Sequence, residues 1–170
     1  PLQLAQAMAT LANDGVAYKP HIVNHIDDFR GEQRVDVESQ RERTLDLKRE
    51  HLAVVKNAMV GVAREGTSAR SFAGAAYVSA GKTGTAQVIG IKQGEKYVES
   101  KVTEELRDHS LYIAYAPAEK PRIALAVIVE NAGFGARAAA PVARKVLDYY
   151  LLGKVPAPER RVREDHASGH

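Results

Sequence analysis

The chain has 170 residues, of which 45% are hydrophobic, and it carries a formal net charge of +3. This length and composition predict one globular domain or a large part of one. Cysteine is absent, which excludes disulfides and thiolate metal sites. Nucleic-acid binding would need a basic face with aromatic or base-reading residues, and the sequence shows none. The longest apolar run, Ile123–Val129, is too short to span a bilayer.

Apolar residues at helical spacing predict a first helix that ends at the turn Asn13-Asp14-Gly15. The stretch from Tyr18 to Leu45 is polar and β-branched, so it predicts a short hairpin with its turn at residues 30–32.

The clearest helical pattern covers residues 47–64. Asp46 is expected to cap its first turn, and Gly66 is expected to end it. Four residues are predicted to form its buried stripe: Leu52, Val55, Met59 and Val62. A last helix is expected over residues 141–151, closed by Gly153. Its predicted buried stripe consists of Val142, Val146 and Tyr149.

Three strands are predicted between these helices, over Tyr77–Ile91, Ser110–Ala116 and Arg122–Glu130. The charged residues 92–108 are expected to form a surface excursion. The short turn Pro117–Pro121 should join the last two strands as an antiparallel hairpin. The element order therefore predicts an α+β fold, with an antiparallel sheet covered by helices.

We expect one domain over residues 1–154 and a disordered tail over residues 155–170. The tail is rich in Pro, Arg and Glu and offers almost nothing apolar to bury. The chain begins at Pro1 without an initiator Met and enters a helical pattern at once. These features indicate a piece cut from a longer protein.

The most informative motif is Lys82-Thr83-Gly84-Thr85 on the first predicted strand. An ammonium group and two hydroxyls at a strand edge can grip a carboxylate while an extended peptide pairs with the strand. Gly84 leaves room for a ligand backbone to lie close. Residues 83 and 85 share one face of a strand, whereas Lys82 points the other way or reaches around the edge. The motif alone is weak, because four such common residues arise by chance.

Ser79 and Lys82 have the spacing of a Ser-x-x-Lys nucleophile motif. That chemistry needs both side chains on one turn of a helix, so that the amine can take the hydroxyl proton. Gly81, Gly84 and the β-rich surroundings favour a strand, on which residues three apart face opposite sides. We therefore reject Ser79 as a nucleophile.

Asp108, His109 and Ser110 contain the residue types of a catalytic triad, but adjacent residues in one strand cannot supply that arrangement. We expect them to cap a loop entering a strand, with His109 orienting a nearby loop. His21 and His25 are four apart, as metal ligands on a helix would be, but their neighbours favour a strand. No third ligand is evident, and no metal and no cofactor are predicted.

Seven short pieces together are specific although each is common. They are Pro1-Leu-Gln-Leu-Ala-Gln6, Asn13-Asp14-Gly15, Gly61-Val62-Ala63 leading to Gly66-Thr67, Lys82-Thr-Gly-Thr-Ala-Gln-Val88, Leu106-Arg-Asp-His109, Ala114-Tyr-Ala-Pro117 and Val129-Glu-Asn131. With these pieces the chain resembles the C-terminal part of the transpeptidase domain of class B penicillin-binding proteins, most of all the branch of cell elongation. Lys-Thr-Gly is one of three motifs of such enzymes. The resemblance covers about residues 1–153.

The resemblance implies the C-terminal portion of a β-lactamase/transpeptidase-like fold. It implies a periplasmic enzyme, anchored by an upstream membrane helix, that transfers acyl groups between peptidoglycan stem peptides through a serine. β-Lactam antibiotics would trap its acyl-enzyme. The expected partners are stem peptides, β-lactams, the upstream part of the same protein and the cell-elongation machinery, with no nucleic acid. The serine–lysine and Ser-x-Asn motifs of the family precede the part present here.

The resemblance implies that Lys82 supplies positive field in the cleft and assists a proton relay. The hydroxyls of Thr83 and Thr85 bind the terminal carboxylate of the substrate, beside Gly84. The backbone N–H of Thr85 is the expected second donor of an oxyanion hole. Two other functions stay open on the sequence: a non-catalytic penicillin-recognising sensor, and a β-lactamase or carboxypeptidase that hydrolyses the acyl group.

Overall fold

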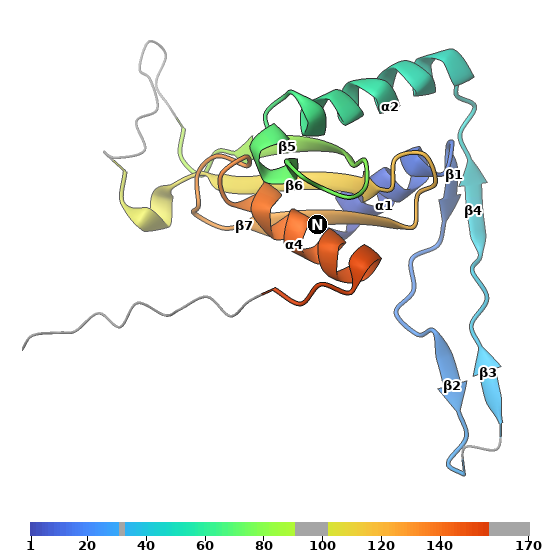
Figure 1. Cartoon of the computed structure of the whole chain (residues 1–170). Coiled ribbons are helices and arrows are strands. Elements are labelled where there is room, and N and C mark those ends of the chain that lie inside the picture. Colours follow the sequence, from blue (N-terminus) through green and yellow to red (C-terminus); the bar gives the residue numbers. More distant parts are fainter. Residues whose placement is uncertain (31–32, 91–101, 157–170) are drawn as a thin grey trace, which may run out of the picture.

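The computed structural model describes residues 1–30, 33–90 and 102–156. It has a body, in which helices cover a three-stranded sheet, and a long hairpin that projects from the body (Figure 1). The predicted tail lies outside the described residues from residue 157 on, and so does the predicted surface excursion up to residue 101. The rest of that excursion includes the short 3-10 helix η2 (Glu104–Leu106).

The central sheet consists of β5 (Ala80–Ala86), β6 (His109–Ala116) and β7 (Ile123–Val129), in the spatial order β5-β6-β7. Both pairings are antiparallel, and Thr83 lies opposite Tyr112. The predicted hairpin of the last two strands and the predicted α+β class are therefore confirmed.

Strand β5 is shorter than the predicted strand Tyr77–Ile91. Before the strand, the carbonyl of Val78 accepts the N–H of Ala118 at 2.8 Å, beyond the end of β6. After it, the N–H of Val88 donates to the carboxylate of Asp108 at 3.4 Å. The ends of β6 thus decide the length of β5, because a strand extends only as far as its partner.

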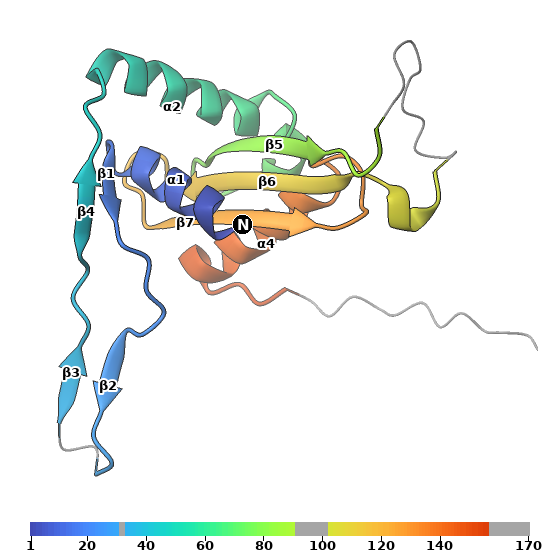
Figure 2. The ribbon, with the colours of Figure 1, turned by 180° about the vertical axis from the view of Figure 1, so that it is seen from behind.

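Helices cover both faces of the sheet. Helix α4 (Ala139–Leu152) packs on the face that carries Tyr112, and α1 (Leu2–Ala12) packs on the face that carries Tyr115. Figure 2 shows α1 in front of the strands and α4 behind them. Helix α2 (Arg49–Arg64) runs beside β5 and contributes to both apolar clusters.

Helix α4 contradicts the predicted stripe of Val142, Val146 and Tyr149, which are exposed by 41%, 41% and 59%. The face that meets the sheet consists of smaller residues and one leucine: Ala139, Ala140, Ala143 and Leu147. Alanine lets the helix axis approach the sheet closely, and both sets of residues recur at helical spacing. Periodicity therefore identified the helix but assigned the wrong face.

Helix α2 begins at Arg49, two residues later than predicted, and has no side-chain cap, so Asp46 is not its cap. Leu52 and Met59 are buried as predicted, whereas Val55 is exposed and Val62 is only half-buried. Gly66 follows the helix end as expected, and its N–H donates to the carbonyl of Gly61 at 2.9 Å. The predicted cap and the predicted stripe of α2 are thus corrected, and the predicted role of Gly66 is confirmed.

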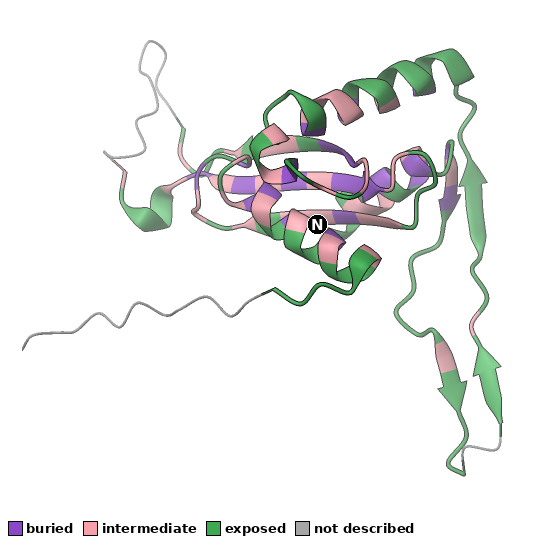
Figure 3. Cartoon of the chain, in the orientation of Figure 1, coloured by how far each residue is buried: buried purple, intermediate pink, exposed green. Residues whose placement is uncertain are grey.

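The predicted hairpin between residues 18 and 45 is confirmed as two short antiparallel pairs. β1 (Val16–Tyr18) pairs with β4 (Arg41–Thr44), and β2 (His25–Asp27) pairs with β3 (Arg34–Asp36). Residues 31 and 32 of its predicted turn lie outside the described residues. Figure 3 shows that the outer part of this hairpin is exposed along nearly its whole length.

We expect Leu147→Ala to lower the free energy of unfolding by about 2–5 kcal/mol, because its side chain is fully buried between α4 and the sheet. Leu152→Ala is the matched control, since Leu152 lies on the same helix but is exposed by 38%, and it should cost less than about 1 kcal/mol. Denaturant unfolding measures both changes. Equal losses for the two variants would contradict this packing.

Candidate active-site wall

The Lys-Thr-Gly-Thr motif occupies the middle of β5, an edge strand of the sheet. Thr83 lies opposite Tyr112 and Thr85 lies opposite Ser110. Directly opposite residues of an antiparallel pair share one face, so both threonines lie on the face that α4 covers. This confirms the prediction that residues 83 and 85 share a face.

The backbone of β5 presents polar groups on its open edge. A Cβ built at Gly135 would touch the nitrogen and oxygen of Gly84 and the carbonyl oxygen of Leu111, so these three atoms lie together between β5 and β6. Backbone groups alternate in direction along a strand. The backbone N–H and C=O groups of Thr83 and Thr85 therefore face the open edge.

Lys82 starts on the opposite face of the sheet and reaches around this edge. Its Nζ donates to the carbonyl oxygen of Thr83 at 2.7 Å. Of the two placements that the sequence left open, the structure has the second. Among the described residues no carboxylate forms an ion pair with Lys82. The exposed ammonium group is therefore available to an anion.

A further hydroxyl, which sequence reasoning missed, meets the motif from outside the sheet. The Oγ1 atoms of Thr67 and Thr83 lie 2.8 Å apart. Thr67 belongs to the turn between α2 and α3 (Ala69–Phe72), 16 residues before Thr83. The one available signal was that Gly66-Thr67 is among the pieces that carry the family resemblance.

Ser79 is not placed as a nucleophile partner of Lys82. It precedes β5 rather than lying on a helix, and its side chain is buried, with 2% exposure. The Lys82 amine turns to Thr83 instead. The rejection of a Ser-x-x-Lys helix at this position is confirmed.

The three side chains of Asp108, His109 and Ser110 have three different partners. Asp108 accepts the backbone N–H of Val88 at 3.4 Å, and His109 Nδ1 accepts that of Asn131 at 3.0 Å. The Ser110 hydroxyl accepts the N–H of the first residue of α4 at 3.0 Å. The run therefore orients loops and a helix start, and the prediction that it forms no triad is confirmed.

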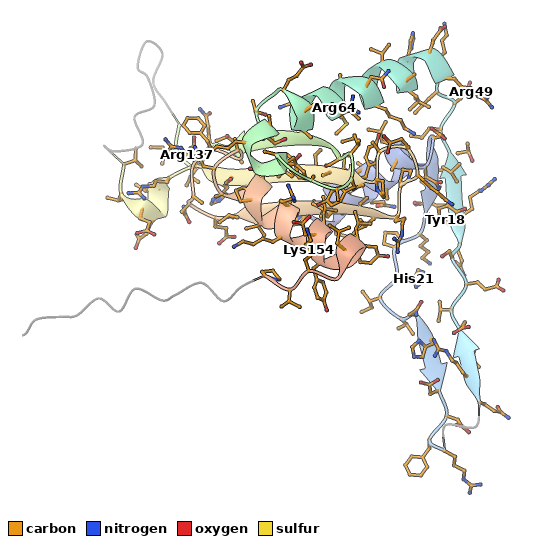
Figure 4. The ribbon with its side chains drawn as sticks, viewed as in Figure 1. Tyr18, His21, Arg49, Arg64, Arg137 and Lys154 are labelled. Carbon is orange, nitrogen blue, oxygen red and sulfur yellow. The ribbon has the colours of Figure 1, made fainter. Side chains whose placement is uncertain are left out.

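His21 lies on the segment between β1 and β2 (Figure 4). His25 is the first residue of β2. The His25 ring contacts Asp27 at 3.4 Å and Arg34 at 3.0 Å. Within residues 1–30, 33–90 and 102–156, no group of three or more His, Asp or Glu side chains could hold a metal ion. The same ranges contain no helix with the length and apolar character needed to cross a membrane.

Known proteins match most of this chain, including the residues of the candidate wall. The family model described as penicillin binding protein transpeptidase domain matches residues 1–148. The peptidoglycan D,D-transpeptidase MrdA of Haemophilus influenzae is 39% identical over 167 residues, which are 94% of this chain and 25% of that protein. The chain thus spans about a quarter of the length of the curated relatives it matches.

Solved structures agree with the sequence relatives. Pseudomonas aeruginosa PBP2 in complex with WCK 5153 is 36% identical, with a TM-score of 0.67, covering 95% of this chain and 33% of that chain. Penicillin-binding protein A of Mycobacterium tuberculosis, an imipenem acyl-enzyme complex, is 30% identical, with a TM-score of 0.67, covering 89% and 30%. The resemblance found in the sequence is confirmed, and the chain belongs to the penicillin-binding protein transpeptidase domain family.

Proposed function

We propose that this chain is part of a peptidoglycan D,D-transpeptidase and that β5 forms one wall of its active site. One observation carries the proposal: an ammonium group, two hydroxyls and outward-facing backbone groups meet on the open edge of four consecutive residues, 82–85. The names of the relatives support the reaction class.

The proposed ligand is an extended acyl peptide that ends in a carboxylate. The hydroxyls of Thr83 and Thr85 share a face and would donate to the carboxylate, and the Lys82 ammonium would add positive field. The edge of β5 beside Gly84 would pair with the peptide backbone, as strand addition does elsewhere. The imipenem acyl-enzyme of the Mycobacterium tuberculosis relative supports β-lactams as ligands of the parent protein.

The proposed reaction transfers an acyl group. A serine hydroxyl of the parent protein attacks the carbonyl carbon of the D-Ala-D-Ala bond, the C–N bond breaks, and D-Ala leaves as an amine that carries the proton lost by the serine. An amine of a second stem peptide then takes the acyl group and returns a proton to the serine. The outward N–H of Thr85 would stabilise the tetrahedral oxyanion, a contribution worth roughly 2.7–4 kcal/mol in serine acyl transfer. Lys82 would assist the proton relay near the serine of the Ser-x-Asn motif.

The same proposal places the parent protein at the periplasmic face of the inner membrane, beside the cell-elongation machinery. Cross-linking of stem peptides takes place where the cell wall lies, and the MrdA relatives are named for that reaction. The nucleophile and the Ser-x-Asn motif are then assigned to the remaining three quarters of a protein of the relatives' length.

In the intact parent enzyme, Lys82→Ala and Thr85→Val should each slow acylation by benzylpenicillin about tenfold or more. The first removes the cation, and the second removes a hydroxyl that donates to a charged group while keeping the shape of the side chain. Second-order acylation rates, measured by trapping the adduct over time, test both.

Lys120→Ala and Thr44→Val are matched controls, because both side chains are exposed and lie on other elements. Neither should change the acylation rate, and Thr85→Val should leave the unfolding transition unchanged. Wild-type rates in both β5 variants would rule out β5 as the substrate wall.

The isolated 170-residue chain should form no covalent adduct with penicillin. Acylation needs an activated hydroxyl about 3 Å from the carbonyl, together with donors that face the oxyanion. The chain holds one proposed donor and the proposed carboxylate grip, but Ser79 is buried and no base faces it on a helix. Intact mass spectrometry after incubation with a labelled penicillin measures this. A stoichiometric adduct on Ser79 would overturn the assignment.

A further inference from the structure

We infer that Tyr112 is a positioning residue for the proposed carboxylate-binding hydroxyls, because it holds Thr67 against Thr83 by way of Ser68. The inference rests on the proposed function of β5. It concerns a buried group beneath the wall, which would not itself touch the substrate.

The Tyr112 side chain is fully buried on the same face of the sheet as Thr83, which lies directly opposite it. A Cβ at Gly81 would overlap the hydroxyl oxygen and the ring of Tyr112. Only glycine therefore fits at position 81 while the phenol lies there, which accounts for the glycine that precedes the Lys-Thr-Gly motif. The ring also stacks on Phe72 of α3, with 5.8 Å between centroids.

The phenol lies within hydrogen-bond distance of the turn that follows α2. Its oxygen lies 3.1 Å from the Oγ atom of Ser68, which is also fully buried. When the one proton of the Ser68 hydroxyl goes to the carbonyl of Val62, at 3.0 Å, Tyr112 is the donor to Ser68. Burial raises the pKa of the Tyr112 phenol, which keeps this proton in place at neutral pH.

The turn that contains Ser68 is attached to the sheet at two points. Tyr112 of β6 bonds to Ser68, and Thr83 of β5 meets the preceding residue, Thr67, at 2.8 Å. Because Thr83 and Tyr112 are opposite each other, the two attachments close a ring through the turn and the β5–β6 pairing. Loss of the phenol oxygen would leave Thr67 held from one side only.

This ring has a chemical consequence at the wall. A threonine hydroxyl has one proton to donate and two lone pairs to accept. When Thr67 donates to Thr83, the Thr83 proton is free for a ligand carboxylate, and the Thr83 side chain is kept from turning away. Tyr112 would thus act on recognition of the carboxylate and leave the chemistry at the nucleophile unchanged.

The test uses the intact parent protein and compares acylation by benzylpenicillin with acylation by its methyl ester, which lacks the anionic carboxylate. Tyr112→Phe should lower the second-order rate with benzylpenicillin about two- to tenfold, the range that one hydrogen bond supplies. The rate with the methyl ester should change by less than about twofold on the same grounds. Ser68→Ala, which removes the acceptor, should give the same pattern.

Two further variants separate positioning from general damage. Thr83→Val removes the hydroxyl that is positioned, so adding Tyr112→Phe to it should cause no further loss. Tyr115→Phe removes another fully buried phenol oxygen from β6, on the opposite face, where it has no hydrogen-bond partner among the described residues. Tyr115→Phe should leave both acylation rates unchanged.

The outcomes discriminate between the two proposals. A wild-type protein that forms no adduct overturns the proposed function, and this inference with it. A wild-type protein that is acylated normally while Tyr112→Phe matches it, or slows both ligands equally, overturns the inference alone. Additive losses in the double variant with Thr83→Val overturn it in the same way.

Discussion

Strand β6 is paired on both edges and covered on both faces, and this double enclosure fixes the geometry of everything around it. Its two tyrosines, Tyr112 and Tyr115, are fully buried on opposite faces. The register sets Thr83 opposite Tyr112, and the phenol in turn requires glycine at position 81. The residue types on β5 are thus constrained from below by a side chain of the neighbouring strand. An error of one residue in the register would move the threonine hydroxyls to the other face.

The open edge of β5 presents a physical conflict, because unpaired backbone groups invite pairing with other chains. Lys82 moderates that conflict by donating to the outward carbonyl of Thr83. This hydrogen bond is exposed to solvent, so a ligand carboxylate can replace it. The same side chain therefore protects the edge in the free protein and would supply the cation in the proposed complex.

The sequence predicted those parts of the fold that depend on short stretches of neighbouring residues. The β6–β7 hairpin follows from two apolar runs and a short turn, and the motif lies on a strand as expected. The prediction of the buried face of α4 was wrong because Ala143 and Val142 both belong to sets of apolar residues at helical spacing. Only packing against the sheet selects the set with the smaller side chains. The predicted length of β5 was wrong because the length of its partner strand, β6, sets it. The contact between Thr67 and Thr83 spans 16 residues, and no single-sequence pattern encodes such a distance.

The glycine of the Lys-Thr-Gly motif is constrained by packing within the chain. A Cβ at Gly84 would lie 3.3 Å from the Cβ of Leu111, which is tighter than ordinary contact, and Gly135 packs over the same backbone from the other face. A side chain at position 84 would therefore have to displace Leu111 by a few tenths of an ångström, with or without a ligand. Packing also constrains Gly81, because a Cβ there would overlap the hydroxyl oxygen of Tyr112. The case for a substrate wall thus depends on Lys82, Thr83 and Thr85, which present an exposed amine, two hydroxyls on one face and an outward N–H.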